Sequence, residues 1–301
     1  MFSCISIPTS RGTTLLNGLR VVRHTLSLVY REPFDFGTTY PSGVIYEALV
    51  SQLRQNVPGV YARLLDQSGH ECPMLIAPEH PVQTDYHPGE VLTLRLTLIG
   101  KAGDHLEALL TALIALEETG FDINREVGQG SFYLSKVVTH TPEGRCYVVY
   151  DRGVGPFYDV SVPWTAADAA REATRYDPRE VTLDFDRPIV PAIAPYRWPA
   201  PAGAQVVRPL AWRLRQMLVR YCGRYANLQP LLTEAEAIEA HMDHVAHHAV
   251  WRDPGCTPLA ALTGRLTLRG SLAPVLPLLV AGQWVHMGRA CHLGLGRYRL
   301  T

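Results

Sequence analysis

Lysine and long apolar runs are scarce in this 301-residue chain. Of its 28 basic residues only Lys101 and Lys136 are lysines, and the others are all arginines. No stretch reaches the ~18 apolar residues that a membrane-spanning helix requires. The N-terminus also lacks the charged start and apolar core of a secretory signal. We therefore expect a cytoplasmic protein without a membrane-spanning segment.

Cysteine is sparse and scattered as well. The six cysteines form neither a CxxC pair nor a disulfide-dense framework, so we expect free thiols in a reducing compartment. They are Cys4, Cys72, Cys146, Cys222, Cys256 and Cys291. What the chain does contain is 47% hydrophobic and 19% charged residues, the composition of a globular protein long enough for two domains.

The formal net charge of zero conceals a separation of charge along the chain. Residues 197–301 carry twelve arginines, no lysine and five acidic residues, whereas residues 1–196 carry sixteen basic and twenty-three acidic residues. We expect the basic half to meet a polyanion, because guanidinium groups suit bidentate contact with phosphate. The codon bias of a GC-rich genome could explain the ratio of arginine to lysine, but it does not explain this segregation.

Glycine, arginine and histidine are interspersed in the segment GQWVHMGRACHLGLGRYRLT at residues 282–301. Glycine lets backbone N–H groups approach a phosphate because no Cβ stands in the way. The arginines add positive charge, and from Pro254 onward there are no acidic residues. We therefore expect a loop that binds anions. Its predicted contacts are Gly288, Arg289, His292, Gly294, Gly296 and Arg297.

A similar pattern occurs earlier in the chain. Its first copy is RLTLIG at 95–100, an apolar helical stretch at 104–119 and GQGSFYL at 128–134. Its second copy is RLTLRG at 265–270, an apolar stretch at 272–280 and GLGRYRL at 294–300. Both copies read as strand, helix, Gly-x-Gly and strand. This internal similarity predicts a duplicated βαβ-type module.

Hydrophobic periodicity extends the first copy to a complete fold. Alternating apolar residues predict a strand over 19–30, and Pro41 with Ser42 opens a helix that runs to about residue 55. Further strands are expected near 74–77, 91–98 and 131–138, with the helix from Asp104 before the last one. The resulting order, βαββαβ, is the ferredoxin-like arrangement.

The second half is expected to repeat this arrangement after a connector that holds a short helix at 166–174. Its predicted elements are a strand at 180–185, a proline-rich loop at 188–201, helices at 206–225 and 233–250, and a strand at 262–268. The expected fold class is α+β, with two tandem ferredoxin-like (RRM-like) domains and a C-terminal glycine-rich loop. The domains would span 1–150 and 179–301, joined by a connector at 151–178.

The segment GQWVHMGRACHLGLGRYRL, preceded by TGRLTLRGSLAPVLPLL, resembles the end of the CRISPR repeat-processing endoribonucleases, the sixth Cas family of the RAMP superfamily. YPSGVIYEALVSQL resembles the first helix of this family, and GQGSFYLSKV resembles the first domain's counterpart of the glycine-rich loop. The resemblance covers most of the chain. It implies the same duplicated ferredoxin-like architecture.

For function, the resemblance implies metal-independent cleavage of precursor CRISPR RNA at the 3′ side of a repeat stem-loop. The substrate's own 2′-hydroxyl would attack the adjacent phosphorus and leave a 2′,3′-cyclic phosphate and a 5′-hydroxyl end. This chemistry needs a base, an acid and donors around the phosphorane, and no cofactor. The implied partners are the repeat RNA and other Cas subunits of an effector complex.

In this family a tyrosine in the first helix and a histidine after it often act, and Tyr46 matches the tyrosine. The usual Leu-His-Asp position reads Leu64, Leu65 and Asp66, so the expected histidine is absent. His70 is the nearest substitute, although it could also be an exposed loop residue. His24 is a further candidate, but it lies on the same face of its predicted strand as the apolar residues and could equally be a core histidine. The missing histidine leaves open a noncatalytic, RNA-binding subunit of a CRISPR complex.

Arginines recur along the predicted helix at 206–225. Arg213, Arg220 and Arg224 are spaced to form one stripe beside its apolar face. Such a stripe could grip the phosphates of an RNA stem, since paired RNA is read mainly by shape. A solvated helix face explains the same spacing equally well.

A cluster of histidines suggests an alternative function that depends on a metal ion. On a helix over 233–250, His241, His244 and His248 would share a face, and that spacing can bind zinc. No zincin pattern and no distant carboxylate or cysteine set accompanies them. We therefore expect no metal, which leaves a histidine-centred metal hydrolase as a distant alternative.

Overall fold

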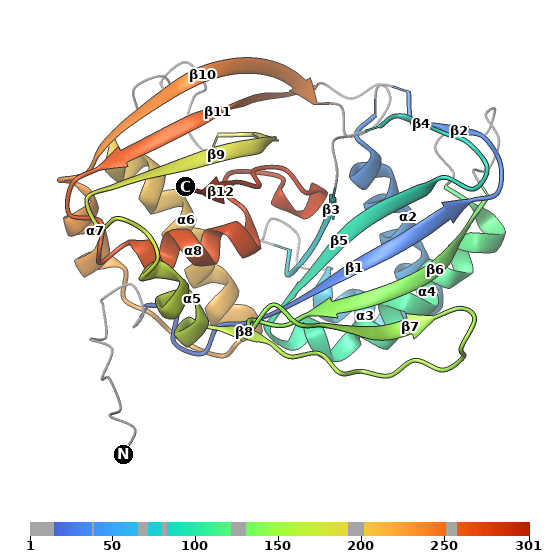
Figure 1. Cartoon of the computed structure of the whole chain (residues 1–301). Helices are drawn as coiled ribbons and strands as arrows, with labels where there is room; N and C mark the ends of the chain where they lie inside the picture. The colour runs from blue at the N-terminus through green and yellow to red at the C-terminus, as the bar shows by residue number, and fades with distance from the viewer. Residues whose placement is uncertain are drawn as a thin grey trace.

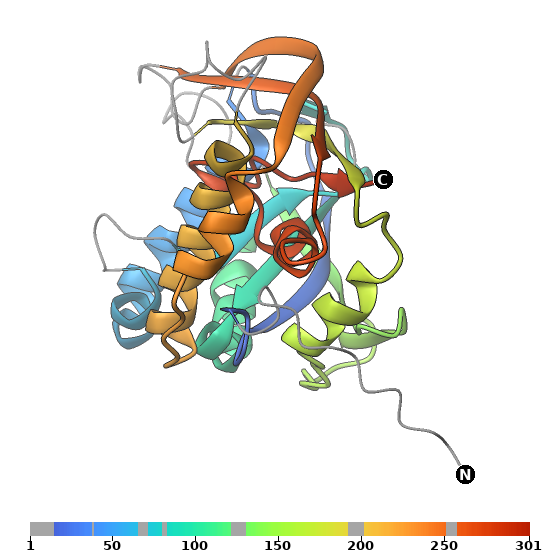
Figure 2. The ribbon, with the colours of Figure 1, turned by 90° about the vertical axis from the view of Figure 1, so that its left-hand side faces the viewer.

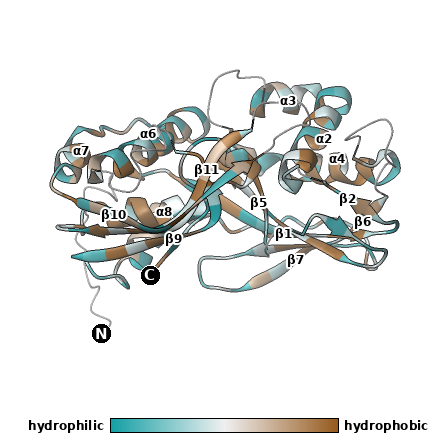
Figure 3. Cartoon of the chain, turned by 90° about the horizontal axis from the view of Figure 1, so that it is seen from above, coloured by the Kyte–Doolittle hydropathy of each residue, from teal (hydrophilic) through white to brown (hydrophobic). Residues whose placement is uncertain are grey.

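The computed structural model describes residues 15–37, 39–65, 72–79, 83–121, 131–191, 202–250 and 258–301. These residues form two main antiparallel sheets that lie beside each other, each packed against helices, and a small two-stranded sheet (Figure 1). Seen from above, α2 (Pro41–Asn56), α3 (Pro58–Leu64) and α4 (Leu106–Thr119) lie on the same side of the molecule as α6 (Gly203–Tyr221) (Figure 3).

The first sheet has the strand order β3-β5-β1-β6-β7. These strands are β1 (Arg20–Tyr30), β3 (Met74–Pro78), β5 (Val91–Ile99), β6 (Phe132–His140) and β7 (Cys146–Asp151). On β1 every second side chain from Val22 to Tyr30 is buried, because successive residues of a strand point to opposite faces. The short helix η1 (Gly100–His105) leads into α4, and β2 (Phe34–Asp35) pairs with β4 (Asp85–Tyr86).

The second sheet has the order β10-β11-β9-β12. Its strands are β9 (Glu180–Ile189), β10 (Glu239–Val250), β11 (Leu259–Arg269) and β12 (Arg299–Leu300). The helices of this half are α6, α7 (Gln229–Ala235), α8 (Leu276–Val285) and the short η3 (Cys291–Leu293). In both sheets the first strand lies between the third and the fourth, and the second lies outside the third. This shared order confirms the tandem ferredoxin-like fold.

The helix expected over 233–250 is wrong, because most of that range forms β10. The alanines and glutamates of this range have a high helix propensity. The pairing of β10 with β11 from Glu239 to Val250 outweighs that local preference. The strand occupies the edge of the sheet and is mostly exposed, so it lacks the apolar alternation that marks a strand. A bulge between Asp243 and Ala246 interrupts it, with His244 at φ 52.

The expected connector is built into both halves. Its β8 (Trp164–Thr165) pairs with the start of β1, and its α5 (Ala166–Ala173) packs on α8. Asp168 caps α5, since its carboxylate accepts hydrogen bonds from the N–H and the hydroxyl of Thr165. The rings of Trp164 and Trp284 meet edge to face at 5.2 Å between centroids. The two halves are therefore held together by more than a linker.

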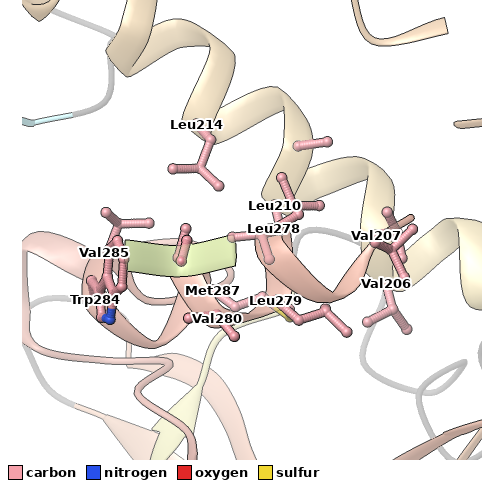
Figure 4. Close-up of a cluster of buried hydrophobic side chains, with 14 of the residues drawn as sticks. Val206, Val207, Leu210, Leu214, Leu278, Leu279, Val280, Trp284, Val285 and Met287 are labelled. Atoms are coloured by element: carbon pink, nitrogen blue, oxygen red, sulfur yellow. The ribbon is translucent and has the colours of Figure 1, made fainter. Parts of the chain in front are cut away.

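The core of the second half lies between α6 and α8 (Figure 4). The buried side chains shown there are Val206, Val207, Leu210, Leu214, Leu278, Leu279, Val280, Trp284, Val285 and Met287. The described cysteines Cys72, Cys146, Cys222 and Cys291 are free thiols, as expected. Among the described residues, no helix is both long and apolar enough to cross a membrane.

Candidate functional site

The N-terminal helix α2 and the C-terminal helix η3 meet in a junction that joins the two halves. The Ser42 hydroxyl donates a buried hydrogen bond of 2.6 Å to the carbonyl oxygen of Leu293. One turn further along α2, the ring of Tyr46 contacts the ring of His292, with 4.7 Å between centroids and 53° between planes. The structure thus brings together two residues that the sequence suggested separately, Tyr46 for catalysis and His292 for RNA contact.

The phenol of Tyr46 is largely enclosed. Tyr46 is 9% exposed, and its hydroxyl donates to the Cys72 thiol at 3.4 Å. Burial raises the pKa of Tyr46 above its ordinary value, and it raises the pKa of Cys72 to about 11. Both groups are therefore protonated at neutral pH. Tyr46 can donate a hydrogen bond there, but its raised pKa makes it a weaker acid than an ordinary tyrosine, and it is not a base.

The glycines of the C-terminal loop are required for close packing. Gly288, Gly294 and Gly296 have φ of 95°, 78° and 70°, a region that other residues rarely adopt. A Cβ on Gly294 would lie 2.6 Å from Cα of Ala77 in β3, and a Cβ on Gly296 would lie 1.7 Å from the Met287 carbonyl oxygen. Glycine at position 294 therefore lets the loop lie directly against the first sheet, and glycine at position 296 lets the loop fold closely on itself.

Two of these backbone N–H groups are already used within the chain, which corrects the reason expected for the glycines. The Gly294 N–H donates to the Cys291 carbonyl at 2.9 Å, and the Gly296 N–H donates to the Pro188 carbonyl at 2.8 Å. Both glycines are buried. In this conformation they shape the loop instead of presenting their amides to a phosphate.

The arginines of the loop differ in what they contact. Arg297 is buried and makes a bidentate ion pair with Asp186, with contacts of 2.7 and 3.2 Å, and it also donates to the Pro78 carbonyl at 3.3 Å. It therefore joins β9, β3 and the end of the loop. Arg289 is exposed, and His292 is partly exposed. Among the expected loop contacts, these two keep side chains that an RNA can reach.

The expected arginine stripe on α6 is not formed. Arg213 is buried, and its Nε donates to the Val285 carbonyl at 3.1 Å, because this face of α6 packs toward the end of α8. Arg220 is partly buried. Arg224 is exposed but follows the last residue of α6, Tyr221, so it leaves the helical spacing on which the stripe depended.

The other candidates lie elsewhere. His24 is fully buried in β1 without a hydrogen-bond partner, and burial lowers its pKa to about 4. It has no accessible surface from which to reach RNA, so a core histidine describes it better than a catalytic one. His70, the sequence Gln129–Gly130 and Asp66 lie outside the described residues.

The histidines expected on one helix face are instead on the exposed strand β10. His241 pairs with Asp243 at 2.8 Å, and His248 contacts the Thr263 hydroxyl at 2.9 Å. In the part of the chain that the structure describes, no group of three or more His, Cys, Asp or Glu side chains is placed to hold a metal ion. The helical spacing that suggested zinc does not exist.

A cationic cavity between the two halves was missed from the sequence. It has a volume of about 250 Å³ and is lined by Arg23, Arg95, Arg297 and Trp164, with Glu79 beside them. The Arg23 guanidinium lies 5.0 Å from the centre of the Trp164 ring, and burial lowers its pKa to about 9. The sequence does contain a pattern that could have indicated this cavity. On β1 and β5 the residues that alternate with the buried ones include serine and threonine, and Arg23 and Arg95 lie among them.

Comparison with family models gives two matches along the chain. Residues 183–298 match the model described as CRISPR-associated endoribonuclease Cas6, and residues 40–161 match AF_1859_N, described as an N-terminal domain. No curated protein matches the chain in sequence.

Solved structures share the fold over nearly the whole chain. A Cas6 product complex has a TM-score of 0.60 at 18% identity and covers 93% of this chain and 100% of its own. Thermus thermophilus Cas6 has a TM-score of 0.56 at 18% identity, covering 94% and 99%. A partial Cas6-RT-Cas1–Cas2 complex has a TM-score of 0.60 at 15% identity, covering 95% of this chain but 47% of that chain.

Two tandem ferredoxin-like folds joined at the η3 loop are the architecture that this chain shares with the solved Cas6 structures. Together with the family match over residues 183–298, this confirms the resemblance seen in the sequence. The second half of the chain, residues 183–298, is similar to the CRISPR-associated endoribonuclease Cas6 family.

Proposed function

We propose that this protein is a metal-independent endoribonuclease that binds the stem-loop of a CRISPR repeat and cuts precursor CRISPR RNA. In support, residues 183–298 match a family model described as CRISPR-associated endoribonuclease Cas6. The observation that carries the proposal for this chain is the contact between Tyr46 and His292, which joins the first helix to the C-terminal loop. We retain domains at 1–150 and 179–301, with the cleavage site between them.

In the proposed reaction, the 2′-oxygen of one nucleotide attacks the phosphorus that follows it, and the bond from this phosphorus to the 5′-oxygen breaks. A base removes the proton of the 2′-hydroxyl and an acid protonates the leaving 5′-oxygen. The products carry a 2′,3′-cyclic phosphate and a 5′-hydroxyl. No metal is needed because cationic side chains and hydrogen-bond donors can stabilise the phosphorane.

His292 is our candidate for the base in this chain. It supplies an imidazole beside Tyr46, where the Leu-His-Asp histidine of the family is missing, while His70 remains a second candidate for the same role. Tyr46 contributes a protonated phenol, which suits a donor. The exposed Arg289 lies three residues before His292 and supplies positive charge for the phosphate.

The decisive experiment incubates the purified protein with its repeat RNA, with and without EDTA. We expect equal cleavage in both and a cyclic phosphate on the upstream product. RNA with 2′-deoxyribose at the cleavage site should bind with unchanged affinity and remain whole. Loss of cleavage with EDTA would refute metal independence, and cleavage of the deoxy substrate would refute the 2′-hydroxyl mechanism.

A noncatalytic RNA-binding subunit is the alternative, and the enclosed hydroxyl of Tyr46, bonded to Cys72, favours it. In that case the same assay would give tight binding of repeat RNA without product. Association with other Cas proteins fits either proposal, since a solved relative is part of a Cas6-RT-Cas1–Cas2 complex. Co-purification with the effector subunits tests this association.

A further inference from the structure

The last turns of α6 carry an aromatic and arginine cluster on the outer surface. The guanidinium carbon of Arg215 lies 4.9 Å from the ring centre of Trp212 and 4.9 Å from that of Tyr225. Arg215 also donates a hydrogen bond of 3.2 Å to the Tyr225 hydroxyl. We call Trp212, Arg215 and Tyr225 the α6 platform. The arginine links the two rings into one unit, so they are not independent mobile side chains.

Both rings remain open to solvent. Trp212 is 51% exposed and Tyr225 is 75% exposed. Tyr225 lies beyond the helix end, where Gly223 turns the chain at φ 64 and the Arg224 N–H donates to the Leu218 carbonyl at 3.0 Å. Large aromatic rings held at the surface by ordered contacts are typical of binding sites, where Trp, Tyr and Arg contribute most of the binding energy.

The charge around the platform selects a polyanion. Residues 203–229, which include all of α6, contain five arginines and no acidic residue. Of these arginines only Arg213 is buried. A positive surface that also carries exposed rings suits unpaired RNA, because the phosphates meet the arginines and the bases stack on the rings. Paired RNA offers no free base faces to such rings.

The platform lies close to the candidate cleavage site. Tyr221, on the opposite face of the same helical turns, is buried beside Cys72, which accepts the hydrogen bond from Tyr46. The helix body, about 10 Å across, therefore separates the platform from the junction. Figures 2 and 3 show α6 on the same side of the molecule as the N-terminal helices. A few unpaired nucleotides that leave the junction can span this distance, because a stacked strand already rises by about 3.4 Å per nucleotide.

We propose that the α6 platform binds unpaired bases of the RNA that flank the repeat stem, by stacking them on Trp212 and Tyr225. The identity of the RNA rests on the proposed function, whereas the stacking itself does not. The platform adds affinity for single-stranded flanks, separate from any contact with the stem.

The test measures RNA affinity by fluorescence anisotropy for the wild type and for Trp212→Ala with Tyr225→Ala. Three RNAs are used: a blunt repeat stem-loop, the same stem-loop with unpaired flanks, and those flanks with abasic nucleotides. Each lost stack should weaken binding of the flanked RNA about tenfold. Binding of the blunt stem-loop should not change, and the abasic flank should weaken wild-type binding as much as the double substitution does.

Val219→Ala is the matched control, because Val219 is 44% exposed on the same helix face but offers no ring. It should leave all three affinities unchanged. Equal losses on blunt and flanked RNA would overturn the proposal, and so would unchanged binding of the flanked RNA. A double variant that keeps its RNA affinity but loses self-association or a Cas partner would assign the platform to protein contact.

Oligoadenylate separates this proposal from the proposed function. If the wild type binds oligoadenylate and the double variant binds it at least tenfold more weakly, the platform stacks bases even where repeat RNA is not cut. If repeat RNA is cut while oligoadenylate binding is the same in both proteins, the platform fails and the nuclease assignment stands.

Discussion

The two halves share one strand order but differ in how their last strand is made. In the first half the final ferredoxin strand, β6, runs from Phe132 to His140, while its counterpart β12 has two residues, Arg299 and Leu300. The residues between α8 and β12 form the loop that contains η3 and reaches across to α2 and β3. Because β12 is so short, the residues before it can form a loop, and this loop builds the candidate site between the two ferredoxin-like halves.

We expect the largest effect on cleavage from replacing His292, whose imidazole belongs to this loop. His292→Ala should slow single-turnover cleavage by ~10²–10⁴-fold, the usual contribution of general acid–base catalysis, while RNA affinity stays near wild type. His247→Ala on the exposed strand β10 is the control and should cut normally. An unchanged rate in the His292 variant would pass the base role to His70 and reduce the loop to an RNA contact.

Tyr46 sharpens the same test. Tyr46→Phe keeps the ring against His292 and removes the hydroxyl that donates a hydrogen bond to Cys72. If the phenol is the acid, this variant should lose ~10²–10⁴-fold in rate, and if the ring only positions His292, the rate should be nearly retained.

A second test disrupts the close packing within the C-terminal loop. Gly296→Ala forces a Cβ against the Met287 carbonyl at a backbone conformation with φ of 70°, so we expect a loss of about 4 kcal/mol in the free energy of unfolding. Urea denaturation measures this. Gly59→Ala in α3 has open space around its Cβ and should be neutral. If Gly296→Ala were as stable as wild type, the loop would not need this close packing.

Replacing Arg297, which joins the end of the loop to β3 and β9, should lower the free energy of unfolding by less than Gly296→Ala does. Arg297→Met removes the bidentate partner of the partly exposed Asp186, which keeps the more distant Arg299, while the Pro78 carbonyl keeps its hydrogen bond from Arg187; we expect a loss of about 2 kcal/mol. The matching exposed pair at the sheet edge, Arg269 with Glu180, should contribute nothing measurable when Arg269→Met removes it. Similar losses in both variants would contradict a special role for the buried pair.

Acid should destabilise the protein through a histidine of the first half. The pKa of His24 falls from 6.5 to about 4 on folding, so between these values the unfolded chain binds a proton that the folded chain does not. Stability should therefore be complete above pH 6.5 and fall toward pH 4, by roughly 3 kcal/mol from this residue. His24→Leu should flatten this part of the stability curve. An unchanged slope would assign the acid sensitivity to other groups, such as the buried His286.

How far the sequence could predict this molecule depended on how much local pattern each element carries. The alternation on β1 and the apolar stripe of α4 predicted both elements, because their burial follows a simple period. β10 was missed because an exposed edge strand has no such period and owes its shape to β11. The same reasoning explains Arg213, whose helix position was correct while its burial depends on α8.

The site was predictable only in part, for a related reason. Tyr46 and His292 were each suggested by motif, yet no local pattern indicates that they touch, since 246 positions separate them. The glycines were found, but the close packing of Gly294 against Ala77 depends on the fold of the other half. Cys72 and Asp186 had no motif at all.

The hydrogen bond between Ser42 and Leu293 joins residues 251 positions apart, and this separation bears on the timing of synthesis. A growing chain that ends at β11 already contains α2, with Ser42 and Tyr46, but none of η3. Contacts of such long range also form late in folding, after loops between them have closed. A ribosome that stalls in the second half therefore releases a product that contains every strand of the first sheet but lacks His292 and the rest of the C-terminal loop.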